Sequence, residues 1–438
     1  MSTRLSRLSM LQSASMLLFG LLLIVTNVRC MPFNRLDDNT SSEASSGSSP
    51  ITHVFKEKRV PLSSGHAFAM GKRASPEATH DVIFVVKQKN LDDLSRILDE
   101  TSDPSSSNYG KHWSREEVAN LTSNPDSCES VQRYLVGQKA TIISTTKYGE
   151  EITARAPISI WEKMFKTHFY KYSYSLEGVQ ANKSSSRSTK KHFFRTAKYY
   201  LPGSLDEHVE SVFNTVQMPM IRRHSITLTE TSSSTRLLAE TAHLTPDLLN
   251  KAYHINSNKG HPRATQAVYE TVEEYFSPAD LAQFLKNYSL PVVPVNTTIG
   301  GHSNSSYCIY NVDFCGEGNL DVQYMMAISQ SPTTYFYVDT ENFSGFLTVV
   351  LNSTHPPLVI SISYGQDENS VSSSEMDYFN VQAMKLGLMG VTLVVASGDD
   401  GALSTDARGQ PGNCSYSPSY PASSPYVLSV GATMVSCF

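Results

Sequence analysis

Residues Val391-Thr-Leu-Val-Val-Ala396 form a nearly continuous apolar run, and Ser397-Gly398-Asp399 follows it directly. An apolar run without polar alternation is typical of a strand buried on both faces, as in parallel sheets. In open parallel sheets, binding and catalytic groups gather at the carboxyl ends of the strands. Asp399 is therefore a candidate site residue. The alternative is a turn aspartate that closes its own loop.

Strands of the same kind are predicted on both sides of this run, at residues 334–338, 358–363 and 426–430. Between two of them, Ser372 and Glu375 form a capping box at the start of a predicted helix. Strands separated by helices imply a doubly wound parallel sheet with right-handed crossovers. The fold class predicted for residues 244–438 is α/β.

Upstream of these strands, the stretch Gly316-Glu-Gly-Asn-Leu-Asp-Val-Gln-Tyr324 places two acids four residues apart. In a helix, Glu317 and Asp321 lie one turn apart on the same face. Like charges at this spacing repel, so one acid tends to keep its proton, which allows one acid and one base. The apolar residues that follow place both at the start of a buried helix, where negative charge suits the helix dipole. The alternative is a solvated helix face.

The N-terminal residues 1–30 are predicted to be a signal peptide. Arg4 and Arg7 precede the apolar run 16–25, and a cleavage point is expected near Met31. A signal anchor is the alternative, but the run is short for a membrane span, so no stable span is expected. Asn-x-Ser/Thr sites support a glycoprotein of the secretory pathway. They begin at Asn39, Asn120, Asn182, Asn287, Asn296, Asn304, Asn342, Asn352 and Asn413.

Net charge and the cysteine and histidine motifs bear on two possibilities, a nucleic-acid partner and a zinc site. A net charge of -5 without a basic face gives no electrostatic case for a nucleic-acid partner. Neither Cys-x-x-Cys nor His-Glu-x-x-His occurs, so no zinc site is predicted. In an oxidising compartment a disulfide between Cys308 and Cys315 could close a short loop. Removal of Cys30 with the signal peptide leaves an odd number of cysteines, so one has no disulfide partner within the chain.

The chain before residue 244 divides by composition. Residues 31–77 are rich in Ser and Gly and are predicted to be a flexible segment. Residues 78–221 alternate strand and helix patterns as in a compact α+β domain. The basic stretch 183–191 is expected to be an exposed loop, with a binding patch as the alternative. Residues 222–243, which begin with a pair of arginines, read as a linker open to processing.

Several motifs taken together resemble the sedolisins, the serine-carboxyl peptidases, and among them proenzymes of the tripeptidyl-peptidase I type. The motifs are Glu317-x-x-x-Asp321, Ser363-Tyr-Gly365, Ala396-Ser-Gly-Asp-Asp-Gly-Ala402 and Tyr420-Pro-Ala-Ser-Ser-Pro-Tyr426. Upstream, Ser102-Asp-Pro-Ser-Ser-Ser-Asn-Tyr-Gly110 resembles the activation domain of that family. The resemblance covers about residues 78 to 434 in the right order.

The resemblance implies a subtilisin-like fold preceded by a ferredoxin-like activation domain. Glu317 would be the general base, Asp321 its orienting partner, and Asp399 the protonated acid that binds the oxyanion. A neutral carboxyl donates a hydrogen bond to developing negative charge, whereas a charged one repels it, so work at acidic pH is implied. The implied partners are a peptide or protein substrate and the chain's own activation domain, in a secreted or lysosome-like acidic compartment.

The chain departs from the family pattern in its nucleophile. The family's serine lies in a Ser-Gly-Thr-Ser stretch downstream of the oxyanion acid, and no such stretch occurs here. The nearest string, at residues 46–49, precedes the activation domain and is rejected. The family's calcium site is also missing. No cofactor is therefore expected in this chain, and calcium is expected only in a full-length relative.

Three readings of this departure remain. The first is a peptidase proenzyme that is C-terminally incomplete and inactive as written. The second is a non-catalytic inhibitor that masks the cleft of an intact relative. The third is a misfolded product, because lost sheet and helix layers uncover apolar faces at about 25 cal/mol per Å².

Overall fold

The computed structural model describes residues 52–61, 68–174, 191–219, 244–261, 263–271, 274–310, 314–330, 332–338, 343–399 and 418–432. The predicted signal peptide, the linker and the predicted basic loop 183–191 lie outside these residues, except Lys191, which begins a strand. In the part of the chain that the structure describes, no helix has the length and apolarity needed to cross a membrane.

The N-terminal elements end with β9. They are β1 (His53–Lys58), β2 (Ala69–Arg73), β3 (Thr79–Val86), α1 (Leu91–Ser102), α2 (Arg115–Thr122), α3 (Pro125–Gly137), β4 (Thr141–Thr145), β5 (Glu151–Pro157), α4 (Ile158–Phe165), β6 (Tyr170–Tyr174), β7 (Lys191–Arg195), β8 (Lys198–Pro202), α5 (Gly203–Asp206) and β9 (Val209–Phe213).

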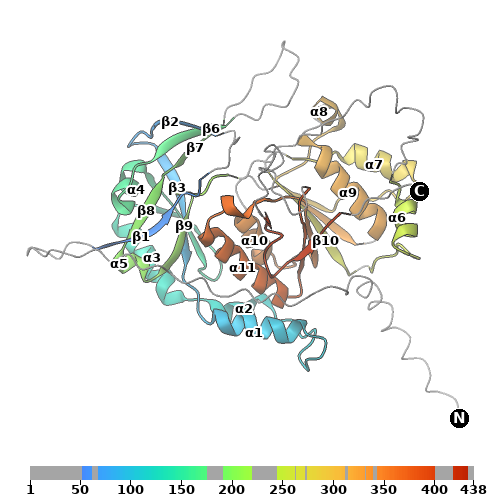
Figure 1. Ribbon diagram of the computed structural model, residues 1–438, viewed down its shortest axis with the longest axis horizontal. Helices are drawn as coiled ribbons and strands as arrows, with labels where there is room; N and C mark the ends of the chain where they lie inside the picture. The colour runs from blue at the N-terminus through green and yellow to red at the C-terminus, as the bar shows by residue number, and fades with distance from the viewer. Residues whose placement is uncertain are drawn as a thin grey trace, which may run out of the picture. The chain divides into compact units, whose positions relative to one another are not determined.

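A four-stranded antiparallel sheet organises the N-terminal part, with strand order β4-β5-β3-β9. Figure 1 labels β3 and β9 of this sheet. Helices α3 and α4 cover one face, where Trp161 and Phe165 stack beside Phe84 of β3. The order strand, helices, two strands, helix, strand with this pairing is the ferredoxin-like topology. The predicted ferredoxin-like α+β arrangement is therefore confirmed.

The C-terminal elements begin with α6. They are α6 (Pro246–Ala252), β10 (Thr265–Glu270), α7 (Pro278–Asn287), β11 (Thr297–Ile299), α8 (Ser305–Tyr310), α9 (Gly316–Ser329), β12 (Thr333–Val338), α10 (Phe343–Asn352), β13 (Val359–Ile362), β14 (Gln366–Asp367), α11 (Ser373–Leu388), β15 (Thr392–Ala396), β16 (Ser419–Tyr420) and β17 (Leu428–Val430).

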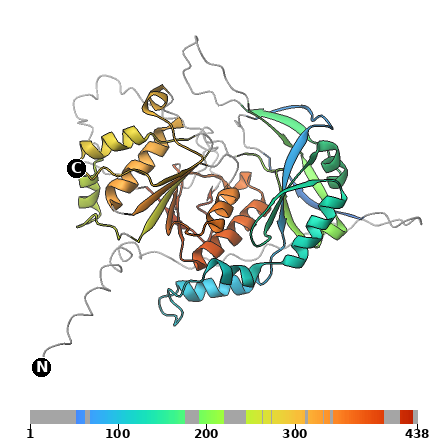
Figure 2. The ribbon, with the colours of Figure 1, turned by 180° about the vertical axis from the view of Figure 1, so that it is seen from behind.

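A six-stranded parallel sheet organises the C-terminal part, in the order β11-β12-β10-β13-β15-β17. Helices α7 and α9 pack on one face around Phe276 and Phe336. Helices α10 and α11 pack on the other face around Phe346 and Phe379 (Figure 2). Helices on both faces of a parallel sheet make the predicted doubly wound α/β fold, which is confirmed.

Helix starts in this part follow the sequence signals. The side chains of Thr245, Ser277 and Ser372 each accept a hydrogen bond from the backbone N–H three residues later. Proline occupies the first turn of α6 and α7, where its missing N–H has no helical partner. Local chemistry therefore sets where three of the layer helices begin.

Two parts of the fold differ from the expectation. Ordered structure begins before residue 78, because β1 pairs with β8 and β2 pairs with β6, both distant in sequence. The central strand β10 was not predicted. It carries buried Gln266 near its start and buried Glu270 at its end, so its sequence lacks the continuous apolar run of its neighbours.

Candidate active site

Helix α9 carries both acids of the predicted pair near its first turn. Glu317 is the second residue of the helix and Asp321 the sixth, and both side chains are partly buried. Val322 and Met326 on the same helix are buried against the sheet. The predicted placement of two carboxylates at the start of an inward-packed helix is thus observed.

Asp321 reaches the carboxyl end of a parallel strand. The hydroxyl of Ser363 donates a hydrogen bond of 2.5 Å to Oδ2 of Asp321. Ser363 directly follows β13, which ends at Ile362. This contact joins the carboxylate helix to the sheet edge at which α/β proteins place their sites.

Asp399 lies three residues beyond the end of β15, and its side chain is exposed. The preceding residue, Gly398, has a φ of +97°, a backbone conformation that residues with a Cβ atom rarely adopt. Strands β13 and β15 are parallel neighbours, so Asp399 and Ser363 follow strand ends on the same edge of the sheet. That Asp399 shares one cavity with Glu317 and Asp321 stays a prediction.

A further acid, Glu270, ends the central strand β10 at this edge and is completely buried. Burial raises its pKa well above the usual value, and the nearby charges of Asp321, Glu274 and Glu317 raise it further. The hydroxyl of Tyr364 acts in the opposite direction. Burial and the neighbouring carboxylates therefore favour the protonated form of Glu270. The sequence analysis missed this acid, which lies at the end of an unpredicted strand.

The start of α9 is anchored by a side chain from another segment. Glu274 is buried, and its Oε1 accepts hydrogen bonds from the backbone N–H groups of Glu317 and Gly318, at 3.0 and 3.1 Å. Cys315, the N-cap residue, provides no side-chain cap. Glu274 thus satisfies two of the donors that a helix start leaves open.

A disulfide fixes the same point from the other side. Cys308 of α8 is bonded to Cys315, as the sequence suggested. Cys128 is a free, buried thiol in α3. Cys414 and Cys437 lie outside the described residues.

Among the residues that the structure describes, no group of three or more His, Cys, Asp or Glu side chains is arranged to hold a metal ion. The calcium expected in a full-length relative stays a prediction. What the arrangement offers chemically is a group of carboxyl groups beside a sheet edge, one of which, Glu270, has a pKa that burial raises.

Two family patterns match successive parts of the chain. Residues 67–218 match the pattern named "Pro-kumamolisin, activation domain". Residues 294–436 match the pattern of the subtilase family. The first corresponds to the ferredoxin-like part, and the second contains α9, β13 and β15.

Curated relatives match over most of the chain. Tripeptidyl-peptidase 1 of Homo sapiens is 30% identical over 380 residues, which is 82% of this chain and 62% of that protein. Physarolisin of Physarum polycephalum is 29% identical over 385 residues, covering 84% of this chain and 62% of that protein. The chain spans about 62% of the length of these relatives.

A solved structure is also similar. It is a Pseudomonas sedolisin, a serine-carboxyl proteinase, complexed with two molecules of pseudo-iodotyrostatin. The identity is 24%, and the match covers 42% of this chain and 52% of that one, with a TM-score of 0.35.

Proposed function

Since the chain belongs to the sedolisin family, with an activation domain followed by a subtilase domain, we propose that it is the pro-form of an acid serine-carboxyl peptidase. The observation that carries the proposal is the hydrogen bond from Ser363 to Asp321. It attaches the carboxylate helix to the strand ends, where an α/β enzyme gathers its reacting groups.

The proposed roles follow from the order of the acids. Glu317 takes the proton of an attacking hydroxyl, and Asp321, held by Ser363, orients Glu317. Asp399 donates a hydrogen bond to the oxyanion, which requires that it carry a proton. Acidic solution meets this requirement, so we expect the family reaction to belong to an acidic compartment of the secretory pathway.

The nucleophile decides whether this chain turns over substrate. No Ser-Gly-Thr-Ser stretch occurs at a suitable place in the 438 residues. We therefore expect this chain to contain the general base and the oxyanion donor but to hydrolyse no peptide. Whether the family reaction here is the release of tripeptides or the cleavage of internal bonds is a matter for substrate profiling.

The direct test incubates the purified chain with a peptide library at pH 4, after cleavage between the two domains. The expected result is no product. Hydrolysis that disappears in Glu317→Gln would contradict the expectation and show that another hydroxyl attacks.

A second candidate is a masking protein without catalysis. The observation in its favour is that the N-terminal domain packs against α11 of the peptidase part, as Leu94 and Met384 share one buried cluster. We would express residues 31–222 alone and add them to an active sedolisin. Inhibition at micromolar concentration supports the masking function, and full activity of the sedolisin contradicts it.

A further inference from the structure

Gly318 and Asn319 lie between the two acids of α9, and both contact residues 274–277, the segment that leads into α7. Gly318 is buried in this contact. A Cβ added to it would lie 2.7 Å from the carbonyl oxygen of Tyr275, closer than two such atoms approach in a folded protein. A larger residue at position 318 would therefore push the start of α9 away from this segment.

The side chain of Asn319 connects α9 to the start of α7. Its Oδ1 accepts a hydrogen bond of 2.9 Å from the backbone N–H of Ser277. Ser277 is completely buried and is the N-cap residue of α7, where its hydroxyl accepts from the N–H of Asp280 at 3.2 Å. A buried backbone N–H without a partner is costly, so Asn319 supplies a bond that the start of α7 needs.

Glu274 makes the corresponding bonds in the opposite direction. It lies before α7, and its Oε1 accepts from the N–H groups of Glu317 and Gly318 in the first turn of α9, at 3.0 and 3.1 Å. A residue beside α7 thus caps α9, and a residue of α9 caps α7. We call this pair of side chains, Glu274 and Asn319, the reciprocal cap.

Helix α8 is attached to both of these helix starts. The hydroxyl of Ser305, its first residue, donates to a carboxylate oxygen of Asp280 in the first turn of α7 at 2.6 Å and lies 3.1 Å from the hydroxyl of Ser277. The disulfide between Cys308 and Cys315 joins α8 to the N-cap residue of α9. The starts of three helices therefore meet at one place, and the reciprocal cap connects two of them.

Apolar packing alone would leave the position of Glu317 loosely defined. Val322 and Met326 pack α9 against the sheet, but hydrophobic contacts are not directional. Hydrogen bonds depend on distance and angle, so the reciprocal cap fixes both the rotation of α9 about its axis and its position along that axis. This precision matters because catalytic groups must be held within about 0.5 Å of their working geometry.

We propose that Asn319 and Glu274 are positioning residues for the general base, because their reciprocal cap fixes where Glu317 lies relative to the strand ends. The inference rests on the role proposed for Glu317 and adds the residues that hold it in place. It also gives the two residues after Glu317 separate tasks: Gly318 allows the close approach of segment 274–277, and Asn319 bonds to it.

The alternative is a pair of independent caps, each of which stabilises only the helix start that it contacts. The two arrangements differ in how far a change is felt. The N–H of Glu317 is bonded to Glu274 and that of Ser277 to Asn319. In a reciprocal cap, removal of the Asn319 side chain loosens the Glu317 amide as well, although Asn319 is not its bonded partner.

The test measures hydrogen exchange in the full chain, resolved to single amides by mass spectrometry. In Asn319→Ala we expect exchange at the Ser277 amide to become about fivefold faster, the effect of losing one hydrogen bond. At the Glu317 amide we expect exchange at least about threefold faster, because the opening of one helix start opens the other. Unchanged exchange at Glu317 overturns the proposal.

Two variants show whether the effect belongs to the bond itself. Asn319→Asp keeps an oxygen that accepts from Ser277 and should restore slow exchange at both amides. Asn258→Ala is the matched control, since Nδ2 of Asn258 donates to the carbonyl of Ile328 near the other end of α9, at 2.8 Å. It should leave exchange at Glu317 unchanged. An equal effect of Asn258→Ala would mean that any loss of stability in α9 loosens its start.

The double variant Glu274→Ala/Asn319→Ala tests reciprocity. Side chains that act as one unit give a combined effect smaller than the product of the two single effects, whereas independent caps give the product. Gly318→Ala provides a second route to the same result, because its Cβ would force α9 away from Tyr275. It should speed exchange at Ser277 and Glu317 together. Multiplicative single effects overturn the reciprocal cap.

The position of the Glu317 side chain is read by carbodiimide coupling of a small amine, at no more than one modification per molecule, with peptide mapping. Coupling at Glu317 should be faster in Asn319→Ala, restored in Asn319→Asp and unchanged in Asn258→Ala. Unchanged coupling in Asn319→Ala would show that the cap does not position this carboxylate. None of these measurements requires turnover. A wrong catalytic role for Glu317 would leave the expected pattern intact, and a wrong cap would change it whatever the chain hydrolyses.

Discussion

At the residue scale, the chemistry of the candidate site is a matter of acids that lie close together. Asp321, Glu274 and Glu317 lie close enough to Glu270 for their charges to raise its pKa. Two of them have clear hydrogen-bond partners: Glu274 accepts from backbone N–H groups and Asp321 accepts from Ser363. For Glu270, burial and the nearby carboxylates raise the pKa, which favours its protonated form.

Glu274→Ala should loosen the start of α9. The change removes the acceptor of two backbone N–H groups that no side chain of the N-cap residue replaces. We expect a loss of about 1–2 kcal/mol in the free energy of unfolding. Hydrogen exchange at the amides of Glu317 and Gly318 should become faster than at Met326, later in the same helix.

Glu274→Gln is the control, since its amide oxygen still accepts from both N–H groups. It should retain most of the protection that Glu274→Ala loses. Equal exchange in the alanine variant and the unmutated chain would show that Glu274 does not anchor the helix.

Glu270→Gln should change stability in a pH-dependent way. The raised pKa means that the native state favours the protonated form, so Glu270 costs stability once the pH passes its ordinary value. The glutamine resembles the protonated acid. We expect nearly unchanged urea midpoints at pH 4 and a higher midpoint than the unmutated chain at pH 8. A midpoint that falls at pH 8 would mean that the charged form is the stabilised one.

At the element scale, α11 is the helix on which the arrangement depends. The apolar face that its spacing predicts, with Phe379, Ala383 and Leu386, does pack in the core of the parallel sheet. Its other sides contact a different domain through Tyr378, Met384 and Lys385. Periodicity marks one buried face of a helix, but cannot say that a second domain covers the rest.

Gly390→Ala tests the end of this helix. Gly390 has φ of +86°, and a Cβ there would lie 3.0 Å from the ring of His112. We expect a loss of about 1–2 kcal/mol from backbone strain and crowding, seen as a lower urea midpoint. Gly137→Ala at the end of α3 is the matched control, because no atom lies within 4 Å of its added Cβ and its φ is not positive. Equal midpoints for the two variants would contradict the prediction.

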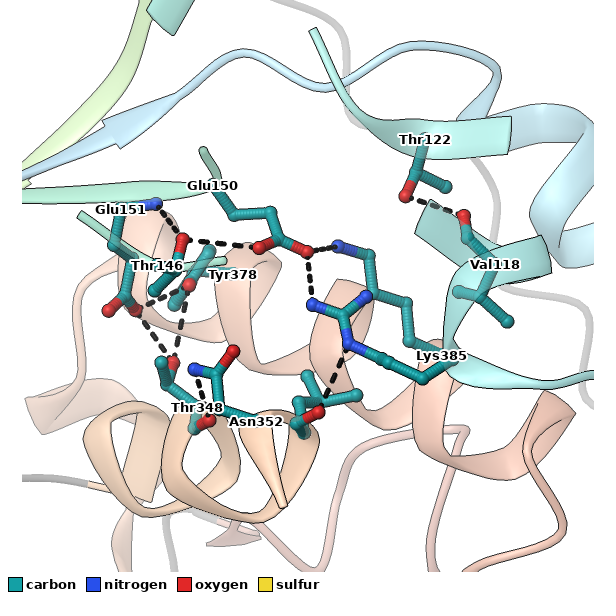
Figure 3. Close-up of polar contacts among 11 residues, drawn as sticks. Val118, Thr122, Thr146, Glu150, Glu151, Thr348, Asn352, Tyr378 and Lys385 are labelled. Carbon is teal, nitrogen blue, oxygen red and sulfur yellow. Dashed lines mark hydrogen bonds and ion pairs between the residues drawn. The ribbon is translucent and has the colours of Figure 1, made fainter. Parts of the chain in front are cut away.

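At the scale of the whole molecule, each domain completes the burial of the other. Lys385 and Tyr378 belong to the C-terminal part, yet their partners Glu150 and Glu151 belong to the N-terminal part (Figure 3). The buried clusters around Leu94 and Phe213 likewise draw residues from both parts. The stability of residues 244–438 is therefore tied to the presence of the N-terminal domain.

Expression of residues 244–438 alone tests this coupling. Removal of the N-terminal domain uncovers Met384 and Leu388 and leaves Lys385 without its carboxylate. We expect stronger binding of a hydrophobic fluorescent dye and faster proteolysis than in the full chain. Addition of residues 31–222 in trans should reverse both effects. A fragment as resistant as the full chain would show that the domains are independent.

The candidate pair was predictable because its spacing is local. Glu317 and Asp321 lie four residues apart, and the helix that carries them follows from the residues between and after them. Glu270 and Glu274 were not predictable, since their importance comes from neighbours about 50 residues away in sequence. Ser363 was part of a quoted motif, but only the folded chain assigns it a contact with Asp321.

The sequence by itself determined the layer architecture, since apolar runs, caps and helical spacing are properties of short segments. It also indicated the family through motifs in a given order. Only the tertiary structure decided that β10 is the central strand, that Glu270 is enclosed by other acids, and that Lys385 is buried against Glu150. The reason is physical. Burial and electrostatic partners depend on which distant segments come into contact, and the residue pattern within one segment does not specify those contacts.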